Sequence, residues 1–195
     1  MDRIHIPVLL KETIDSLDIK PNGFYVDCTL GDGGHSYEIF KQLSSEGVLI
    51  SIDQDQHAID FVNDYYKDQI KDNWRIVRNN FSKIDNILSA YDRKPDGILM
   101  DLGLSSRQLE ESHNRGFSYQ EDNEPLDMRM DESLGVSAKD LLIVLPEKEL
   151  EKLFRTYGEE RYSKRIAHEI KKNITDINTV GDLTRLVYGV VPAGH

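Results

Sequence analysis

Residues 27–36 carry the strongest chemical signal in the sequence. They read Asp-Cys-Thr-Leu-Gly-Asp-Gly-Gly-His-Ser, with glycines at Gly31, Gly33 and Gly34. Glycines let a backbone turn tightly and approach a ligand without a Cβ in the way. An ordinary glycine-rich turn would look similar. This segment, however, follows a strand-like run, opens a helical one and has an acidic residue at the end of the next strand-like run, so we predict a nucleotide site.

Asp53 is that acidic residue, and it stands about 20 residues after the glycines. A carboxylate at this place can accept hydrogen bonds from both hydroxyls of a ribose. The alternative is an aspartate that only caps a helix or closes a turn. Because Asp53 and the glycine loop occur together, we predict that it binds ribose.

Charge indicates which nucleotide is bound. A dinucleotide fingerprint needs Gly or Ala where this chain has Ser36. Asp27 and Asp32 flank the loop, and nearby carboxylates would repel a pyrophosphate. S-adenosylmethionine has no phosphate and carries a cationic amino group and sulfonium. We therefore predict the methyl donor as cofactor, with an NAD-dependent oxidoreductase as the rival enzyme.

Two further strand ends carry candidate residues. Phe81 could pack on an adenine and Asn80 could hydrogen-bond its edge, although a core phenylalanine beside turn asparagines is an equal alternative. Asp101 follows the strand-like run 97–100. Reactive groups in a doubly wound sheet lie at the carboxyl ends of the strands, so Asp101 is the candidate catalytic residue, with a capping role as the alternative.

The elements that must position these residues alternate along the first half of the chain. Strand-like runs at 24–26, 48–52, 74–77 and 97–100 are separated by helical patterns. Such βαβ repeats predict an α/β fold with a parallel sheet and helices on both faces. Residues 102–136 then read as an irregular connection, and 137–191 as helices only, with capping boxes beginning at Ser137 and Thr179. We expect two domains, 1–106 and 107–195.

Composition narrows the class of protein. The chain has 195 residues, a net charge of −11 and one cysteine, Cys28. It has no apolar run long enough for a transmembrane helix and no apolar signal-peptide core, so we expect a cytoplasmic protein that does not bind a membrane. The net negative charge argues mildly against a protein whose whole surface binds nucleic acid. The histidines are scattered and we expect no metal site.

Residues 151–172 carry a net positive charge in an otherwise acidic chain, with seven Lys and Arg against four Glu. Arg161, Lys164, Arg165 and His168 recur at helical spacing and can share one face. A solvated helix face with internal ion pairs would give the same pattern. The functional interpretation is a stripe that contacts phosphates, and it is our candidate RNA-binding surface.

The later segments add a specific resemblance. The chain resembles the MraW/RsmH-type 16S ribosomal RNA (cytosine-N4)-methyltransferases over nearly all of its length. The resemblance is carried by residues 5–10, 31–36, 101–109, 115–118, 125–130 and 157–167. It implies a Rossmann-like class I methyltransferase sheet with an all-helical insert that faces RNA. It also implies that the methyl donor is contacted by Gly33, Gly34, His35, Asp53, Phe81, Asp101 and Gln108.

The resemblance further implies that the substrate is a cytidine in the decoding region of 16S ribosomal RNA, within the small ribosomal subunit. Asp101 would accept a hydrogen bond from the amino group that is methylated, and Phe117 or Tyr119 would stack on the base. Family members continue with further strands, so the sheet of this chain is expected to be incomplete. We therefore expect little activity from the chain alone, and a homo-oligomer could form along the open edge. The rival of another class is a non-catalytic RNA-binding or assembly factor.

Overall fold

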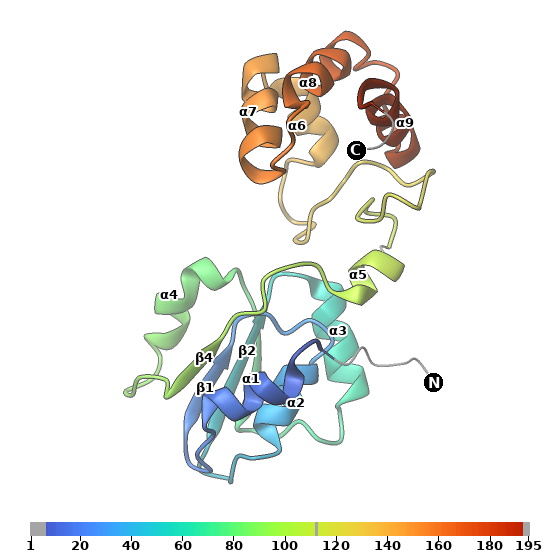
Figure 1. Ribbon diagram of the computed structural model, residues 1–195. Helices are drawn as coiled ribbons and strands as arrows, with labels where there is room; N and C mark the ends of the chain where they lie inside the picture. The colour runs from blue at the N-terminus through green and yellow to red at the C-terminus, as the bar shows by residue number, and fades with distance from the viewer. Residues whose placement is uncertain (1–6, 112, 193–195) are drawn as a thin grey trace. The chain divides into compact units, whose positions relative to one another are not determined.

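The computed structural model describes residues 7–111 and 113–192, which divide between Arg107 and Gln108 into two compact units (Figure 1). His5 and Ile6, which belong to the run 5–10, lie outside the described residues.

The first unit is built on a parallel sheet. Its strands are β1 (Phe24–Asp27), β2 (Val48–Asp53), β3 (Trp74–Arg78) and β4 (Gly97–Leu99), in the order β3-β2-β1-β4. Asp27 is in register with Ser51 of β2 and with Leu99 of β4, and all three pairings are parallel. The predicted α/β fold is confirmed, and the carboxyl ends of the strands meet at one edge of the sheet.

Helices cover both faces of this sheet, so the strands are buried on each side, as is usual for parallel sheets (Figure 1). One face packs against α1 (Leu10–Leu17), α2 (Gly34–Phe40) and α3 (Gln56–Tyr65). The other face packs against the short 3-10 helix η1 (Phe81–Lys83) and α4 (Ile84–Leu88). Tyr25 of β1 points to the first face, whereas Phe24 and Val26 point to the second, as strand alternation requires.

The second unit is helical around its own core. Helix α5 (Ser106–Glu110) crosses the boundary of the units, and α6 (Ala138–Val144), α7 (Glu147–Tyr157), α8 (Ser163–Lys172) and α9 (Val180–Val190) follow. Both predicted capping boxes are present: Ser137 and Asp140 cap α6, and Thr179 and Asp182 cap α9. The core holds buried residues of these helices and of the segments between them, such as Leu150, Ile166 and Ile177.

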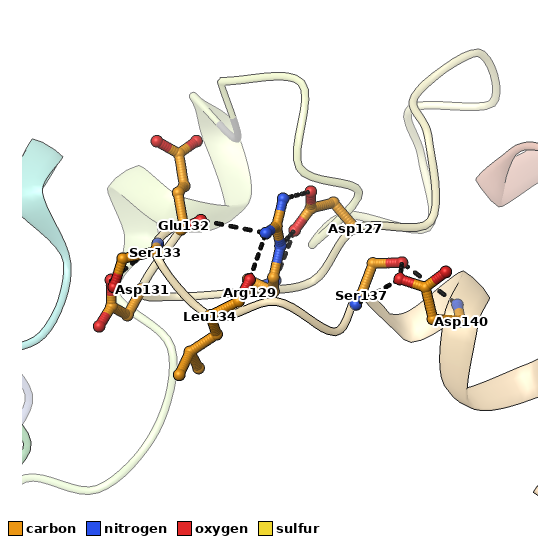
Figure 2. Close-up of polar contacts among 8 residues, drawn as sticks. All are labelled: Asp127, Arg129, Asp131, Glu132, Ser133, Leu134, Ser137 and Asp140. Carbon is orange, nitrogen blue, oxygen red and sulfur yellow. Dashed lines mark hydrogen bonds and ion pairs between the residues drawn. The ribbon is translucent and has the colours of Figure 1, made fainter. Parts of the chain in front are cut away.

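The connection before α6 is irregular but densely hydrogen-bonded (Figure 2). The Arg129 guanidinium donates to both carboxylate oxygens of Asp127, at 2.7 and 2.6 Å, and to the carbonyls of Glu132 and Leu134. The hydrogen bonds from Arg129 hold the pKa of Asp127 below its usual value. Part of the run 125–130 therefore has a clear structural role: Arg129 fixes the loop that leads into α6.

Among the residues that the structure describes, none of the helices combines the length and apolar character needed to cross a membrane.

Candidate functional site

The glycine loop joins β1 to α2 at the carboxyl edge of the sheet. Gly31 and Gly33 have φ angles of +50° and +81°, in the left-handed region that favours glycine. A Cβ at Gly33 would lie 2.9 Å from the ring of Tyr66 on the α3 side. The loop is also tied to β2, because the Leu30 amide donates to the Ile52 carbonyl at 3.0 Å. Glycine is thus required here by backbone conformation and, at Gly33, also by close packing.

Asp53 ends β2 directly beside this loop. Its Oδ2 accepts a hydrogen bond from the Gly31 amide and its Oδ1 one from the Asp55 amide, both at 2.9 Å. Burial raises the pKa of the Asp53 carboxyl, and these hydrogen bonds act in the opposite direction. A carboxylate has about four acceptor positions, so these two bonds and a third from the Gln54 amide leave capacity for a hydroxyl group. The structure therefore brings together the loop and the carboxylate that the sequence paired.

Asp27, at the end of β1, is fully buried beneath the loop. Ser36 of α2 donates to its Oδ2 at 2.6 Å, and the Thr29 amide donates to its Oδ1 at 3.0 Å. Burial raises the pKa of Asp27, and the bonds from Ser36 and Thr29 oppose the rise. Ser36, the departure from a dinucleotide fingerprint, therefore has a physical reason: its hydroxyl satisfies a buried carboxylate.

Asp32 points to a different partner. Its Oδ1 lies 3.1 Å from Nε of Arg107, and the two side chains are only 9% and 12% exposed. The Arg107 guanidinium also lies over the Phe61 ring of α3, 3.6 Å from the ring centroid. The sequence argument, that Asp27 and Asp32 would together repel a phosphate and attract a cation, needs correction. One of these carboxylates is buried under the loop and the other is neutralised by Arg107.

Asp101 is the carboxylate that lies open at this edge. It follows β4 and its side chain is 63% exposed, with Oδ2 at 3.9 Å from Nδ1 of the buried His35. The Asp101 amide donates to the Thr29 hydroxyl at 2.8 Å. Within the described part of the chain, Nε2 of His35 is buried and has no hydrogen-bond partner. His35 and Asp101, from different elements, are thus brought together beside the glycine loop.

The contacts of Asn80 and Phe81 resemble those of a turn asparagine and a core phenylalanine more than those of adenine-binding residues. Asn80 caps η1 by accepting from the Ser82 amide, and its amide nitrogen donates to Gln54 at 2.8 Å. Phe81 is partly buried and packs against the core under α4. These contacts favour turn and core roles, and an adenine contact by Phe81 stays a prediction.

The candidate residues of the second unit differ in exposure. Gln108 of α5 is buried, and its contact with the methyl donor stays a prediction. Phe117 is buried, with the Arg115 guanidinium 4.8 Å from its ring centroid, whereas Tyr119 is 67% exposed. Of the two aromatic side chains proposed to stack on a base, Tyr119 is the one whose ring is open.

The basic stripe lies at the start of α8. Arg161, Lys164 and Arg165 are exposed, and neither Lys164 nor Arg165 has an ion pair within the described residues. His168 instead pairs with Glu147 of α7, with 3.2 Å between Nδ1 and Oε2. The ion-paired part of the alternative thus applies to His168, whereas for Lys164 and Arg165 the phosphate-contacting stripe stays a prediction beside a solvated face.

Sequence reasoning missed Thr29 and Arg107, although both lie within or next to the motifs it singled out. The contacts of Arg107 with Asp32 and of the Thr29 hydroxyl with Asp101 join residues far apart in the chain, so no local pattern marks them. For metals, no cluster of three or more His, Cys, Asp or Glu side chains with suitable placement occurs in residues 7–111 and 113–192.

Comparison with known proteins agrees with the family resemblance seen in the sequence. A family model described as the MraW methylase family matches residues 2–195. Proteins named ribosomal RNA small subunit methyltransferase H, from the Loch Maree and Kyoto strains of Clostridium botulinum, are 50% identical over 196 residues. The alignment covers 99% of this chain and 62% of each relative, so the chain spans less than two thirds of their length.

A solved structure of an rRNA methylase from Streptococcus thermophilus is also similar. It matches with a TM-score of 0.42 and 17% identity, over 56% of this chain and 63% of that one.

Proposed function

The chain belongs to the MraW methylase family, and from this premise we propose that it binds S-adenosylmethionine and forms the donor-binding part of an enzyme that methylates small-subunit ribosomal RNA. The observation that carries the proposal is the glycine loop fixed beside the Asp53 carboxylate. The names of the relatives support the class of substrate, since they are small-subunit ribosomal RNA methyltransferases.

The residues at the sheet edge fit this cofactor. Gly31 and Gly33 keep the loop free of a Cβ at their two positions, and Asp53 retains acceptor capacity for a ribose hydroxyl. The buried Nε2 of His35 has an unused hydrogen-bonding position, as a residue that meets a ligand would. Asp101 supplies an open carboxylate beside it, which suits a cationic amino acid group. When bound, S-adenosylmethionine supplies an activated methyl group on a sulfonium.

We further propose that the acceptor is N4 of a cytidine in the decoding region of 16S ribosomal RNA. The lone pair of this amino group is delocalised into the ring, so the enzyme must align it and stabilise the positive charge that develops on nitrogen. A carboxylate can accept a hydrogen bond from the amino protons as N4 becomes tetrahedral. Asp101 is the open carboxylate at the strand ends and is our candidate for that role. The base would have to leave its stack to reach it.

RNA contact is proposed for the start of α8. The exposed cations Lys164 and Arg165 stand in its first turn. Cations favour phosphate oxygens. Tyr119, exposed in the same unit, is the proposed stacking aromatic.

Titration calorimetry tests the donor proposal. S-adenosylmethionine and its demethylated product should bind the chain, and NAD should not. Binding of NAD alone would favour the oxidoreductase. The acceptor is tested with the full-length protein, labelled donor and undermodified small subunits, followed by mapping of the labelled nucleotide. Donor binding without label transfer would favour the non-catalytic assembly factor, and label on another nucleotide would overturn the choice of cytidine.

A further inference from the structure

A continuous chain of hydrogen bonds runs beneath the glycine loop. Nε1 of Trp74 on β3 donates to Oγ of Ser51 on β2 at 2.9 Å. Oγ of Ser51 lies 2.7 Å from Oγ of Ser36 on α2, which donates to Oδ2 of Asp27 at 2.6 Å. Trp74, Ser51, Ser36 and Asp27 are all buried, so the chain links four elements, β3, β2, α2 and β1, out of contact with solvent.

The other oxygen of Asp27 extends this chain to the open edge. Oδ1 accepts from the Thr29 amide at 3.0 Å and from the Thr29 hydroxyl at 3.3 Å. The same hydroxyl oxygen accepts the backbone N–H of Asp101 at 2.8 Å. The buried chain therefore ends on the backbone of the carboxylate that is proposed to meet the substrate.

The donors and acceptors fix the direction of each bond. An indole N–H only donates and a carboxylate only accepts, while a hydroxyl has a single proton. Ser36 gives its proton to Asp27, so Ser51 must give its own to Ser36. Thr29 likewise gives its proton to Asp27, which leaves its oxygen free to accept from Asp101. The two oxygens of Asp27, by accepting from Ser36 and Thr29, thus set the orientation of all three hydroxyls.

We propose that Asp27 and Thr29 are positioning residues for Asp101. Strand β4 ends at Leu99, so Asp101 lies beyond the ladder that fixes the strand. Its side chain is mostly exposed and 3.9 Å from His35, too far for a hydrogen bond. The Thr29 hydroxyl holds the Asp101 backbone, and Asp27 holds that hydroxyl. The consequence for methyl transfer rests on the proposed function, whereas the placement of Asp101 does not.

Two substitutions of Thr29 separate its hydroxyl from its bulk. Thr29→Val keeps the branched shape and removes the hydroxyl, whereas Thr29→Ser keeps the hydroxyl. Hydrogen exchange of the Asp101 amide, followed by NMR, should become at least about tenfold faster in the valine variant, because the amide loses its acceptor. In the serine variant it should stay within about threefold of the wild-type rate, since the acceptor is retained.

Ser51→Ala is the matched control, because it cuts the chain at the Trp74 end and leaves Thr29 in place. It should shift the fluorescence of Trp74. The hydrogen-exchange rate of the Asp101 amide should change by less than about twofold, because Thr29 keeps its bonds to Asp27 and Asp101. Equal Asp101 exchange in the wild type and the Thr29→Val variant would overturn the proposal. So would a Thr29→Ser variant that behaves like Thr29→Val.

Turnover of the full-length protein supplies the functional readout. Thr29→Val should lower kcat about 10- to 100-fold and leave the KM for small subunits nearly unchanged, because a displacement of about 1 Å can cost roughly a hundredfold in rate. Thr29→Ser should restore kcat. A change confined to KM would contradict positioning of Asp101. If the wild type transfers no methyl group, the proposed function fails, while Asp101 exchange still decides the role of Thr29.

Discussion

Replacing Arg107 by alanine would leave the Asp32 carboxylate beside the glycine loop without the cation that it pairs with. The ion pair is 3.1 Å long, and both side chains are mostly buried, at 12% and 9% exposure. Removing one member of a buried pair costs about 3–5 kcal/mol, since the remaining charge stays desolvated. The same guanidinium stacks on Phe61 at 3.6 Å, which contributes about 1–2 kcal/mol in a site of this kind. These terms overlap, so we expect a loss of about 3–5 kcal/mol in the free energy of unfolding of the first unit.

The assay is urea unfolding followed by tryptophan fluorescence. Trp74 is the only tryptophan in the sequence and is buried in the core of the first unit, so its signal reports that unit. Asp32→Asn should cost less, about 1–3 kcal/mol, because the amide oxygen can still accept a hydrogen bond from Nε of Arg107 and the guanidinium keeps its place over Phe61. In a double-mutant cycle the two substitutions should be non-additive by about 1 kcal/mol or more, since the side chains touch.

Arg93→Ala is the matched control, since Arg93 also lies over a phenylalanine of the first unit. Its guanidinium is 5.3 Å from the Phe24 ring centroid and donates to the carbonyl of Asn22. No carboxylate is left behind when it is removed, so we expect a loss of about 1 kcal/mol or less. Equal losses for Arg93→Ala and Arg107→Ala would refute the reasoning that the buried charge pair dominates.

Three further outcomes are expected. Asp53→Ala should weaken S-adenosylmethionine binding by about 1.5–3 kcal/mol in titration calorimetry, because it removes charged hydrogen bonds to ribose, and unchanged affinity would contradict the ribose assignment. Burial raises the pKa of Asp27 above 3.8, so the ionised form is penalised in the folded first unit at neutral pH, and the penalty disappears as the pH falls through the raised pKa toward 3.8. The urea midpoint of the Asp27→Asn variant, measured relative to the wild type, should therefore fall as the pH is lowered through this range. A difference in midpoint that is independent of pH would exclude this cause. Arg161→Ala with Arg165→Ala should lower the RNA affinity of the full-length protein and reduce the log–log salt slope by about 1 for each lost phosphate contact. Arg155→Ala, which removes a cation already paired with Glu151 at 3.0 Å, should change the slope less.

The sequence by itself determined the features that depend on neighbouring residues. The alternation of short apolar runs with helical patterns predicted a parallel sheet, and the sheet is present. The capping boxes at Ser137 and Thr179 were readable because a cap and its partner lie three residues apart. Gly31, Gly33 and Asp53 could be paired as a site because parallel strands bring their carboxyl ends to one edge.

Only the tertiary structure decided what each polar side chain of the site does. The sequence treated Asp27 and Asp32 alike, yet one is buried beneath Ser36 and Thr29 and the other is neutralised by Arg107. Phe117 and Tyr119 were equal candidates for stacking, but packing buries the first and exposes the second.

The decisive contacts join residues that are distant in the chain. Arg107 meets Asp32 across 75 positions, and the Asp101 amide meets Thr29 across 72. A local pattern constrains only residues within a few positions of one another, through backbone geometry and periodicity. Which carboxylate is desolvated, paired or left open depends on what the folded chain packs against it, and burial and pairing then set its pKa and its chemistry.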